Sequence, residues 1–327
     1  IMKKTVLIFS FLSLIYISGK SQPESMWQLL QNGTIIRWVY VDGDEFNEIE
    51  LDSRMWEDSY PWGRNIYPNK ELQWYTPGNN FDFSENKINL IVKEETVNER
   101  VTTWYDDDYL LDDGNPNKRL FNYTSGMVMS KRKYKYGLFE ISFKIPEGKG
   151  LWPAFWLYGP ENAEIDVFEF KGENPNIIKT NHHWTENGQH NQNPESWTAI
   201  GSFADGFNNM MLEWGHDAMI CYLNGQEFNL KFHNYPHAMW VIANIAVAGC
   251  CPAPFCHCPD ETTNFPEAFE IEYIRIWKRL DCEEFLTIEN YEQDDSTPTS
   301  FTGKKIEMLN STLNEDESLS LIPTEDI

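Results

Sequence analysis

The chain has 327 residues and a formal net charge of −25, from 51 acidic against 26 basic residues. A chain of this length can bury a sizeable core, in one large domain or in two ordinary ones. The negative charge repels nucleic-acid phosphates and anionic lipid surfaces, so we expect neither nucleic acid nor a membrane surface as partner.

Residues 1–21 have the pattern of a secretory signal peptide. Lys3 and Lys4 precede an apolar run of about 13 residues, which is too short for the roughly 20 helical residues that span a bilayer. Small residues at Gly19 and Ser21 suit cleavage at the end of this segment. We therefore expect a secreted or periplasmic protein with no membrane attachment after cleavage.

The six cysteines of an exported chain favour disulfides over free thiols. Four of them crowd into the segment CCPAPFCHC, residues 250–258, while Cys221 and Cys282 lie farther off. A metal site that includes His257 is the alternative, but C-C and C-x-C spacings do not match the paired C-x-x-C of structural zinc. The pairing of the cysteines stays open.

Short β-rich runs, broken by turn residues, follow one another between about residue 34 and residue 280, and no amphipathic helical stretch of a dozen residues separates them. The clearest runs are TIIRWVYV, KINLIVKEE, SGMVMSKRKY, GLFEISFKI, AEIDVFEF, NMMLEWG, AMICYLNG, WVIANIAVA and FEIEYIRIW. This pattern predicts an all-β fold, a β-sandwich of two antiparallel sheets, in one domain over residues 22–280.

The composition changes after residue 280. Residues 281–327 contain thirteen acidic residues against two lysines, few aromatic residues and the stretch DDSTPTS. Such a composition is typical of a solvated, disordered tail or linker.

The segment AEIDVFEF carries three carboxylates among apolar residues. Side chains alternate along a regular strand, so Glu164 and Asp166 share a face whereas Glu169 would point into the core. An unpaired buried charge there would cost several kcal/mol or more. A one-residue bulge at Val167 and Phe168 restores the parity, and we predict that all three carboxylates share one face.

With such a bulge, the Cα atoms of Glu164 and Glu169 are about 13 Å apart, and the side chains can lean together until the carboxyl groups are about 5 to 6 Å apart. That separation is expected of a retaining glycosidase, in which one carboxylate attacks the anomeric carbon and the other protonates the leaving oxygen. Asp166 lies between them, where it can hydrogen-bond one partner and help to keep the acid protonated.

A strand with the pattern E-x-D also occurs on an ordinary solvated sheet face. The preceding segment GKGLWPAFWLYG favours a different interpretation, because Trp152 and Trp156 stand just before the acids and sugar rings stack on aromatic rings. A row of acids beside Trp residues therefore indicates a carbohydrate site.

These segments resemble glycoside hydrolase family 16, the endo-acting β-glucanases, agarases and carrageenases. EIDVFE is similar to the E-x-D-x-x-E signature of that family in its bulged form, and LWPAFWL is similar to the segment that precedes the signature. Further resemblances follow in order over residues 42–278, at DEFNEIELDSRMW, ELQWYT, TSGMVMSKRKYKYGLFEISFKIPEGKG, EWGHDAMICYLNG, NIAVAG and FEIEYIRIW.

The resemblance implies a β-jelly roll whose concave sheet forms an open cleft for a polysaccharide, in a monomer that needs no cofactor for catalysis. It gives Glu164 the role of nucleophile, Asp166 that of assisting acid and Glu169 that of general acid/base. Positions that line sugar subsites in relatives correspond here to Asn69, Trp152, Trp214 and Asn244.

The segment KTNHHWTE adds two candidate residues to the sugar site. Alternation along a strand turns either Asn181 and His183 or His182 and Trp184 toward the sugar. We predict the first pair.

Many relatives hold one structural calcium ion on the convex face. The corresponding residues here are Glu45 and Glu272, and Glu272 stands where the family has Asp. Carboxylate oxygens are suitable Ca²⁺ ligands, so the resemblance allows a structural calcium site at these two residues.

The substrate stays open between classes. ELQWYT and NIAVAG favour a β-1,3-glucan, whereas GPENA departs from the W-P-x-G-G of glucan-cleaving members and residues 102–120 would add a rim to the cleft. A marine galactan (agarose, porphyran or carrageenan) is the alternative, and the acidic balance argues against the heavily sulfated ones. A transglycosylase and a non-catalytic carbohydrate-binding jelly roll also remain, but the intact acid trio favours an enzyme.

Overall fold

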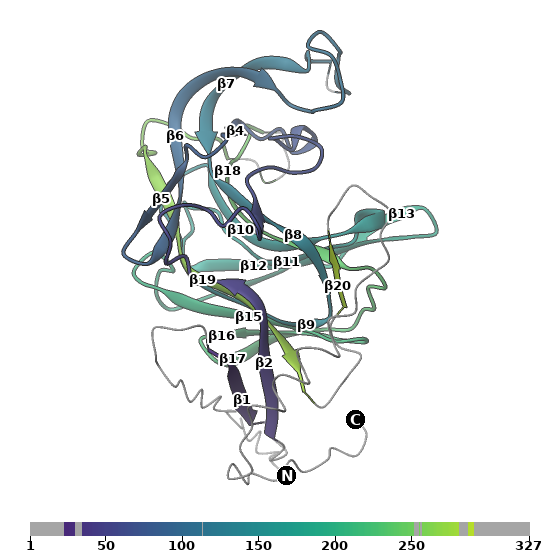
Figure 1. The fold of residues 1–327 in the computed structure, drawn as a ribbon. Helices are drawn as coiled ribbons and strands as arrows, with labels where there is room; N and C mark the ends of the chain where they lie inside the picture. Colours follow the sequence, from purple (N-terminus) through teal and green to yellow (C-terminus); the bar gives the residue numbers. More distant parts are fainter. Residues whose placement is uncertain are drawn as a thin grey trace, which may run out of the picture.

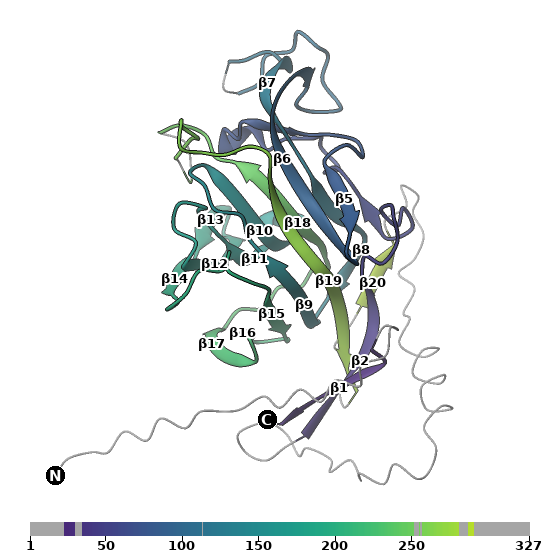
Figure 2. The ribbon, with the colours of Figure 1, turned by 90° about the vertical axis from the view of Figure 1, so that its left-hand side faces the viewer.

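The computed structural model describes residues 23–29, 35–112, 114–251, 255, 257–280 and 287–290. The predicted signal peptide, Cys256, Cys282 and most of the predicted acidic tail lie outside the described residues. Within the described part, the strands form two sheets that pack face to face (Figure 1 and Figure 2).

The first sheet has eleven strands. They are β1 (Ser25–Leu29), β2 (Ile35–Asp44), β4 (Gln73–Tyr75), β5 (Phe81–Ser84), β6 (Lys87–Arg100), β7 (Lys118–Ser125), β9 (Gly137–Lys144), β15 (Asn208–Trp214), β16 (Met219–Leu223), β17 (Gln226–Lys231) and β19 (Glu267–Arg279). Their order is β17-β16-β15-β9-β19-β6-β7-β4, with β2 also paired to β19, β1 to β2 and β5 to β6. Among these described strands, β4 and β7 pair in parallel and the other pairs are antiparallel.

The second sheet has nine strands. They are β3 (Trp56–Glu57), β8 (Met127–Lys135), β10 (Leu151–Tyr158), β11 (Glu164–Glu169), β12 (Ile177–Glu186), β13 (Gln189–Gln192), β14 (Glu195–Thr198), β18 (Met239–Val247) and β20 (Thr287–Asn290). Their order is β13-β12-β11-β10-β18-β8-β20, with β14 paired to β12 and β3 to β8. Two short 3₁₀ helices, η1 (Tyr67–Asn69) and η2 (Pro160–Asn162), precede β4 and β11.

The predicted all-β sandwich is confirmed. Each of the nine β-rich runs singled out in the sequence overlaps a strand, namely β2, β6, β8, β9, β11, β15, β16, β18 and β19. The sequence did not indicate short polar strands such as β13 (QHNQ) and β14 (ESWT). Both are largely exposed and have no apolar alternation, because they are held by pairing with β12 and not by burial.

The main core lies between the sheets and is built from alternate side chains of facing strands. Phe155 and Leu157 of β10 and Leu212 of β15 are fully buried in it. Burial of a side chain of this size contributes roughly 1.5–3 kcal/mol. The intervening residues of β10 point to the opposite face of the second sheet; they are Trp152, Ala154, Trp156 and Tyr158.

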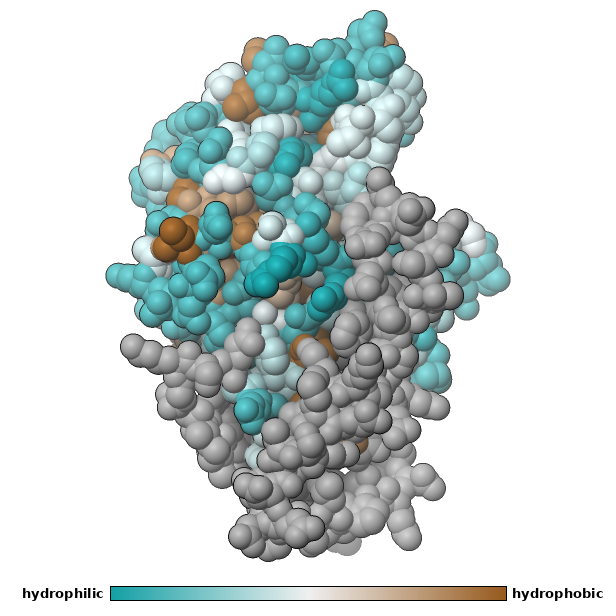
Figure 3. Space-filling model, viewed as in Figure 1, coloured by the Kyte–Doolittle hydropathy of each residue, from teal (hydrophilic) through white to brown (hydrophobic). Residues whose placement is uncertain are grey.

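Strands β6 and β7 continue past the sandwich as a projection, which lies at the top of Figure 1. A small apolar cluster of Val101, Leu111 and Phe121 stabilises it. The buried amide of Asn117 donates to the backbone carbonyls of Thr102 and Tyr105. The face of the molecule in Figure 3 is mainly hydrophilic here, with hydrophobic residues in scattered spots.

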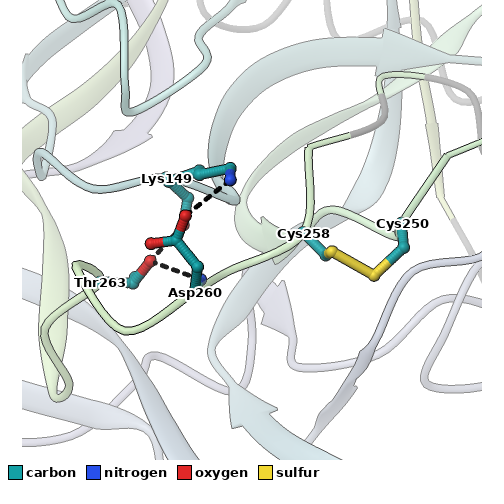
Figure 4. Close-up of a disulfide and its surroundings, with 5 residues drawn as sticks. All are labelled: Lys149, Cys250, Cys258, Asp260 and Thr263. Atoms are coloured by element: carbon teal, nitrogen blue, oxygen red, sulfur yellow. Dashed lines mark hydrogen bonds and ion pairs between the residues drawn. A yellow bond between two sulfur atoms is a disulfide. The ribbon is translucent and has the colours of Figure 1, made fainter.

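Disulfides close the cysteine-rich segment after β18. One joins Cys250 to Cys258, next to an ion pair of 2.6 Å between Lys149 and Asp260 (Figure 4), and Cys251 is also disulfide-bonded. The expectation of disulfides is therefore confirmed for these cysteines. It is wrong for Cys221, which is a free thiol buried in the core on β16, where apolar neighbours surround it.

Part of the predicted tail belongs to the sandwich. Residues 287–290 form β20, which pairs antiparallel with β8, so a disordered tail is wrong for these four residues. The rest of residues 281–327 lies outside the described residues. Among the described residues, no helix has the length and hydrophobicity that crossing a bilayer requires.

Candidate active site

Strand β11 contains the predicted one-residue bulge. Opposite β12, the step from Asp166 to Glu169 on β11 matches the shorter step from Asn181 to Lys179. Opposite β10, the register shifts at the same place, so that Val167 is the surplus residue. The extra residue turns Glu169 back to the side that carries Asp166, while Val167 enters the core.

The bulge separates the side chains of β11 into two sets. Ile165, Val167 and Phe168 are buried in the core between the sheets. Glu164, Asp166 and Glu169 lie on the opposite side of the second sheet, which we call the acid face. Asp166 is 4% exposed, and the two glutamates are partly exposed. The predicted separation of 5 to 6 Å between the outer carboxyl groups stays a prediction.

Burial and mutual repulsion govern the charges of this trio. Burial raises the pKa of Glu164, and the charges of Asp166 and Glu169 raise it further. The pKa of Asp166 is raised by its burial and by Glu169. Burial also raises the pKa of Glu169, although a hydrogen bond from Trp152 lowers it. Such a cluster retains protons at a pH where isolated carboxyl groups are ionised.

The residues of β12 that face the trio are those predicted from its alternation. His183 Nε2 lies 3.1 Å from Asp166 Oδ2 and 2.9 Å from the amide nitrogen of Asn181. On its other side, His183 Nδ1 lies 3.0 Å from His190 Nε2 of β13. His183 is therefore fixed between the central acid and a second imidazole, and the sequence did not indicate His190.

The other two residues of that strand point the opposite way. His182 is 3% exposed, and burial lowers its pKa to about 4. Trp184 packs against the core, and its ring lies beside His233. The choice of Asn181 and His183 for the acid face agrees with this arrangement, and their contact with a sugar stays a prediction.

Trp152 lies beside the trio but is not an open platform. Its indole N–H donates to Glu169 Oε1 at 2.9 Å. Its ring stacks on Phe255, with ring centres 4.3 Å apart, and it is only 8% exposed. Phe255 of the cysteine-rich segment covers one face of the ring, and the contact of Trp152 with a sugar stays a prediction. In the structure, the indole N–H of Trp152 contacts the Glu169 carboxylate.

A fourth acid, which the sequence analysis missed, lies behind Glu169. Glu71 is 5% exposed and accepts hydrogen bonds from Asn69 Nδ2 at 3.1 Å and from Gln73 Nε2 at 2.7 Å. Burial raises the pKa of Glu71 to about 7, and the charge of Glu169 adds to the rise. Asn69, a predicted sugar ligand, is thus bonded to this buried acid. The signal was present in ELQ, where Glu71 stands two residues before Gln73, the first residue of β4.

Asn244 of β18 lies on the acid face with both ends of its amide occupied. Its oxygen accepts from Trp156 Nε1 at 2.7 Å, and its nitrogen donates to the Tyr75 hydroxyl at 2.8 Å. It is 5% exposed. The amide orients two aromatic side chains on the acid face, and the contact of Asn244 with a sugar stays a prediction.

Trp214 is not at the site. It belongs to β15 of the other sheet, has no exposed surface and packs on Tyr136, Phe139 and Tyr235. The predicted sugar subsite at Trp214 is therefore wrong. On β15 the side chains of Met210, Leu212 and Trp214 point into the core, and the Trp214 ring is part of that core.

An aromatic patch continues the acid face beyond Glu164. Tyr158, which pairs with Glu164 across β10 and β11, contacts Trp62 edge to face at 5.4 Å. Trp62 stacks on Tyr60 at 4.8 Å. The backbone N–H of Thr103 donates to the Trp62 carbonyl, so the segment predicted as a rim adjoins this patch.

The predicted calcium ligands do not form a cation site. Both carboxylate oxygens of Glu45 accept hydrogen bonds of 2.7 Å from the guanidinium of Arg275. Glu272 accepts from the hydroxyl of Ser142. A cation at Glu45 would be repelled by the guanidinium, so these residues do not fit Ca²⁺.

Among the described residues, one group of acids and histidine has the spacing of a metal-binding cluster. It consists of Glu164, Asp166 and His183, with one ligand atom of each within 4.8 Å of the others. Glu164 and Asp166 are two members of the acid trio, and His183 is the imidazole that contacts Asp166. The proximity of the three residues is therefore accounted for by the acid face itself.

Comparison with known proteins assigns the chain to a family. A family model described as "Glycosyl hydrolases family 16" matches residues 68–250, which include the acid trio. The chain is 27% identical over 271 residues to "Glucan endo-1,3-beta-glucosidase" from Cryptopygus antarcticus, a match that covers 73% of this chain and 92% of that protein.

Two solved structures have similar folds. The catalytic domain of an endo-1,3-beta-glucanase (laminarinase) from Thermotoga petrophila RKU-1 has a TM-score of 0.61 and 25% identity, over 74% of this chain and 98% of that chain. A structure from work on endo-acting O-glycanases, with which members of the human gut microbiota initiate mucin breakdown, has a TM-score of 0.63 and 25% identity, over 74% and 91% of the two chains.

Proposed function

Since the chain belongs to glycosyl hydrolase family 16, we propose that it cleaves internal β-1,3 linkages of a glucan with retention of anomeric configuration. The enzyme is a glycoside hydrolase. The proposal on the substrate is supported by the activities named for its relatives, a glucan endo-1,3-beta-glucosidase and a laminarinase.

The observation that carries the proposal is the shared face of the three carboxylates. Without the bulge at Val167, the third acid would point into the core. With it, two glutamates flank Asp166 on one face, which supports the assignment of one as nucleophile and the other as acid/base in a double displacement. A module that only binds sugar has no use for this trio.

In the proposed reaction, the ionised Glu164 carboxylate attacks the anomeric carbon while protonated Glu169 gives its proton to the leaving glycosidic oxygen. The C–O bond breaks and a glycosyl ester of Glu164 forms. Glu169, now ionised, takes a proton from a water molecule that attacks the ester from the same side. The product therefore keeps the β configuration.

Asp166 and His183 act in opposite directions on the ionisation of Glu164 in the proposed mechanism. The charge of Asp166 raises the pKa of Glu164, whereas His183 lowers it, so the imidazole helps Glu164 to ionise. A hydrogen bond from Trp152 holds the Glu169 carboxyl group in place. We also propose that the protein acts outside the cytoplasm, in keeping with the disulfide between Cys250 and Cys258.

The test is to incubate the full chain with laminarin, mixed-linkage glucan, agarose and carrageenan and to measure new reducing ends. We expect the highest activity on laminarin and its loss in Glu164→Gln. Glu227→Gln, which changes an exposed glutamate on β17, is the matched control. Activity on a galactan but not on laminarin would overturn the substrate, and inversion in product NMR would overturn the mechanism.

A further experiment separates the roles of the two glutamates. Glu169→Gln should lose most activity on substrates with poor leaving groups, and added azide should partly restore turnover, because azide attacks the ester without base catalysis. Azide should not rescue Glu164→Gln in the same way. A product mixture rich in longer chains would instead indicate a transglycosylase.

A further inference from the structure

Two lysines stand at the edge of the acid face next to Glu169. Lys179 of β12 is the direct cross-strand partner of Glu169. Lys171 follows Glu169 by two positions, after Phe170, which is buried in the core. Both ammonium groups lie near one ring: Lys171 Nζ is 5.0 Å and Lys179 Nζ 4.9 Å from the centre of Phe255.

Neither lysine has an acidic partner among the described residues. Glu169 is bonded to Trp152, and Glu173, the nearest acid that acts on Lys171, forms an ion pair of 3.1 Å with His257. Several lysines in the described part form ion pairs with acids, for example Lys87, Lys144 and Lys149. Others do not, such as Lys93, which donates to the Asn79 carbonyl. Lys171 and Lys179 differ from Lys93 because they are two partly buried ammonium groups beside one ring.

The partly buried surroundings of Lys171 and Lys179 increase the free-energy cost of two neighbouring positive charges. Both side chains are partly buried, and burial together with the charge of Lys179 lowers the pKa of Lys171. Phe255 stacks on Trp152 and contacts the two cations with its ring, which has no negative charge to neutralise them. An anionic group placed between the two ammonium ions would relieve their repulsion and satisfy their donors.

We propose that Lys171 and Lys179 form an anion-binding subsite beside Glu169, which receives a sulfate or carboxylate group carried by the polysaccharide. The substrate would then be a β-1,3-glucan that carries acidic substituents, one of them on a sugar adjacent to the bond that is cleaved. This inference rests on the proposed function for the position of that bond. The net charge of −25 does not predict such a site, because it is a sum over the whole chain and the subsite consists of two neighbouring lysines.

The alternative role for these lysines is to adjust Glu169 alone. Lys179 lowers the pKa of Glu169, so its loss could change the rate on every substrate. The two roles differ in one respect. Adjustment of Glu169 affects neutral and charged substrates alike, whereas an anion subsite changes the preference between them.

The test compares neutral laminarin with two anionic β-1,3-glucans, carboxymethyl-curdlan and sulfated laminarin. We expect the double variant Lys171→Gln/Lys179→Gln to lower the ratio of kcat/KM on an anionic glucan to kcat/KM on laminarin by about tenfold or more, mainly through KM. Arginine at both positions should restore part of the ratio. The two anionic substrates distinguish a carboxylate from a sulfate as the ligand.

Lys93→Gln, on β6 of the other sheet, is the matched control and should leave the ratio unchanged. An equal loss on all three substrates in the double variant would overturn the subsite. Calorimetric titration of the Glu164→Gln protein, with and without the lysine changes, measures the same preference without turnover. Failure of the proposed function appears as inactivity of the unmodified enzyme, and the titration then still decides whether the lysines select anionic chains.

Discussion

Trp152 donates its indole N–H to Glu169 across 2.9 Å, from β10 to the neighbouring strand β11. The stacked Phe255 covers the indole, so the contact is protected from water. A hydrogen bond to a carboxylate in such surroundings is stronger than one at the surface. Trp152 is therefore a positioning residue for the proposed acid/base.

Trp152→Phe should lower kcat/KM about tenfold, because it keeps an aromatic ring against Phe255 but removes the donor. Loss of this bond destabilises the Glu169 carboxylate and raises its pKa. Since Glu169 must be protonated to assist the leaving group, the alkaline limb of the pH–rate profile should move to higher pH. Trp156→Phe, which removes a similar bond to Asn244, is the control. Identical alkaline limbs in the two variants would contradict the role of Trp152.

Glu71 should make the protein less stable as the pH rises. Its pKa is about 7 in the fold, against about 4.3 in an unfolded chain. Between these values the unfolded state has released the proton and the native state holds it, so the free energy of unfolding falls with rising pH, by about 4 kcal/mol in total. Urea unfolding at pH 4.5 and pH 8 should show a smaller fall in Glu71→Gln than in the unmodified protein. Equal falls would show that Glu71 ionises without cost.

Trp214 and Trp62 should respond to substitution in opposite ways. Trp214→Phe should lower the free energy of unfolding by roughly 1–3 kcal/mol and leave kcat/KM nearly unchanged, because the ring fills the core between the sheets and has no exposed surface. Trp62→Ala should raise KM with a smaller effect on stability, because this ring is partly exposed beside Tyr158. Unfolding curves and initial rates on laminarin measure both. A large KM effect at Trp214 would reinstate it as a sugar ligand.

The bulge predicts how β11 tolerates changes in length. Deletion of Val167 leaves Phe168 pointing inward and keeps the three carboxylates on one face, so we expect this variant to fold with a loss of roughly 1–3 kcal/mol and to retain part of its activity. Insertion of one alanine after Val167 also permits regular alternation, but it places Glu169 four strand positions from Asp166 in place of two, about 7 Å farther along the strand, and should abolish activity. Circular dichroism and reducing-end assays on both variants check this. An inactive, unfolded deletion variant would contradict the description of Val167 as surplus.

The acid trio could be predicted from the sequence because strand parity and the cost of a buried charge act within one short segment. The same parity argument selected Asn181 and His183, which face Asp166. It did not decide Trp214, because both faces of β15 carry large side chains and the strand pattern does not show which of them meets the other sheet.

Residues brought from distant segments could not be predicted. Phe255 reaches Trp152 through a loop whose disulfide pairing the sequence leaves open, and His190 reaches His183 through the β12–β13 hairpin. Glu45 is paired to Arg275 from a strand 230 positions away, which no local pattern reveals. Local periodicity thus predicts the faces of strands, whereas contacts between loops and strands depend on tertiary packing.

All three acids belong to one strand in the interior of a sheet, bonded on both sides to β10 and β12. Their spacing is therefore a property of backbone that is paired on both sides, and it does not depend on the closing of a lid or the meeting of two domains. The slowest amide hydrogens to exchange with solvent should be those around the reacting groups, and heat should abolish hydrolysis only when the whole sandwich melts.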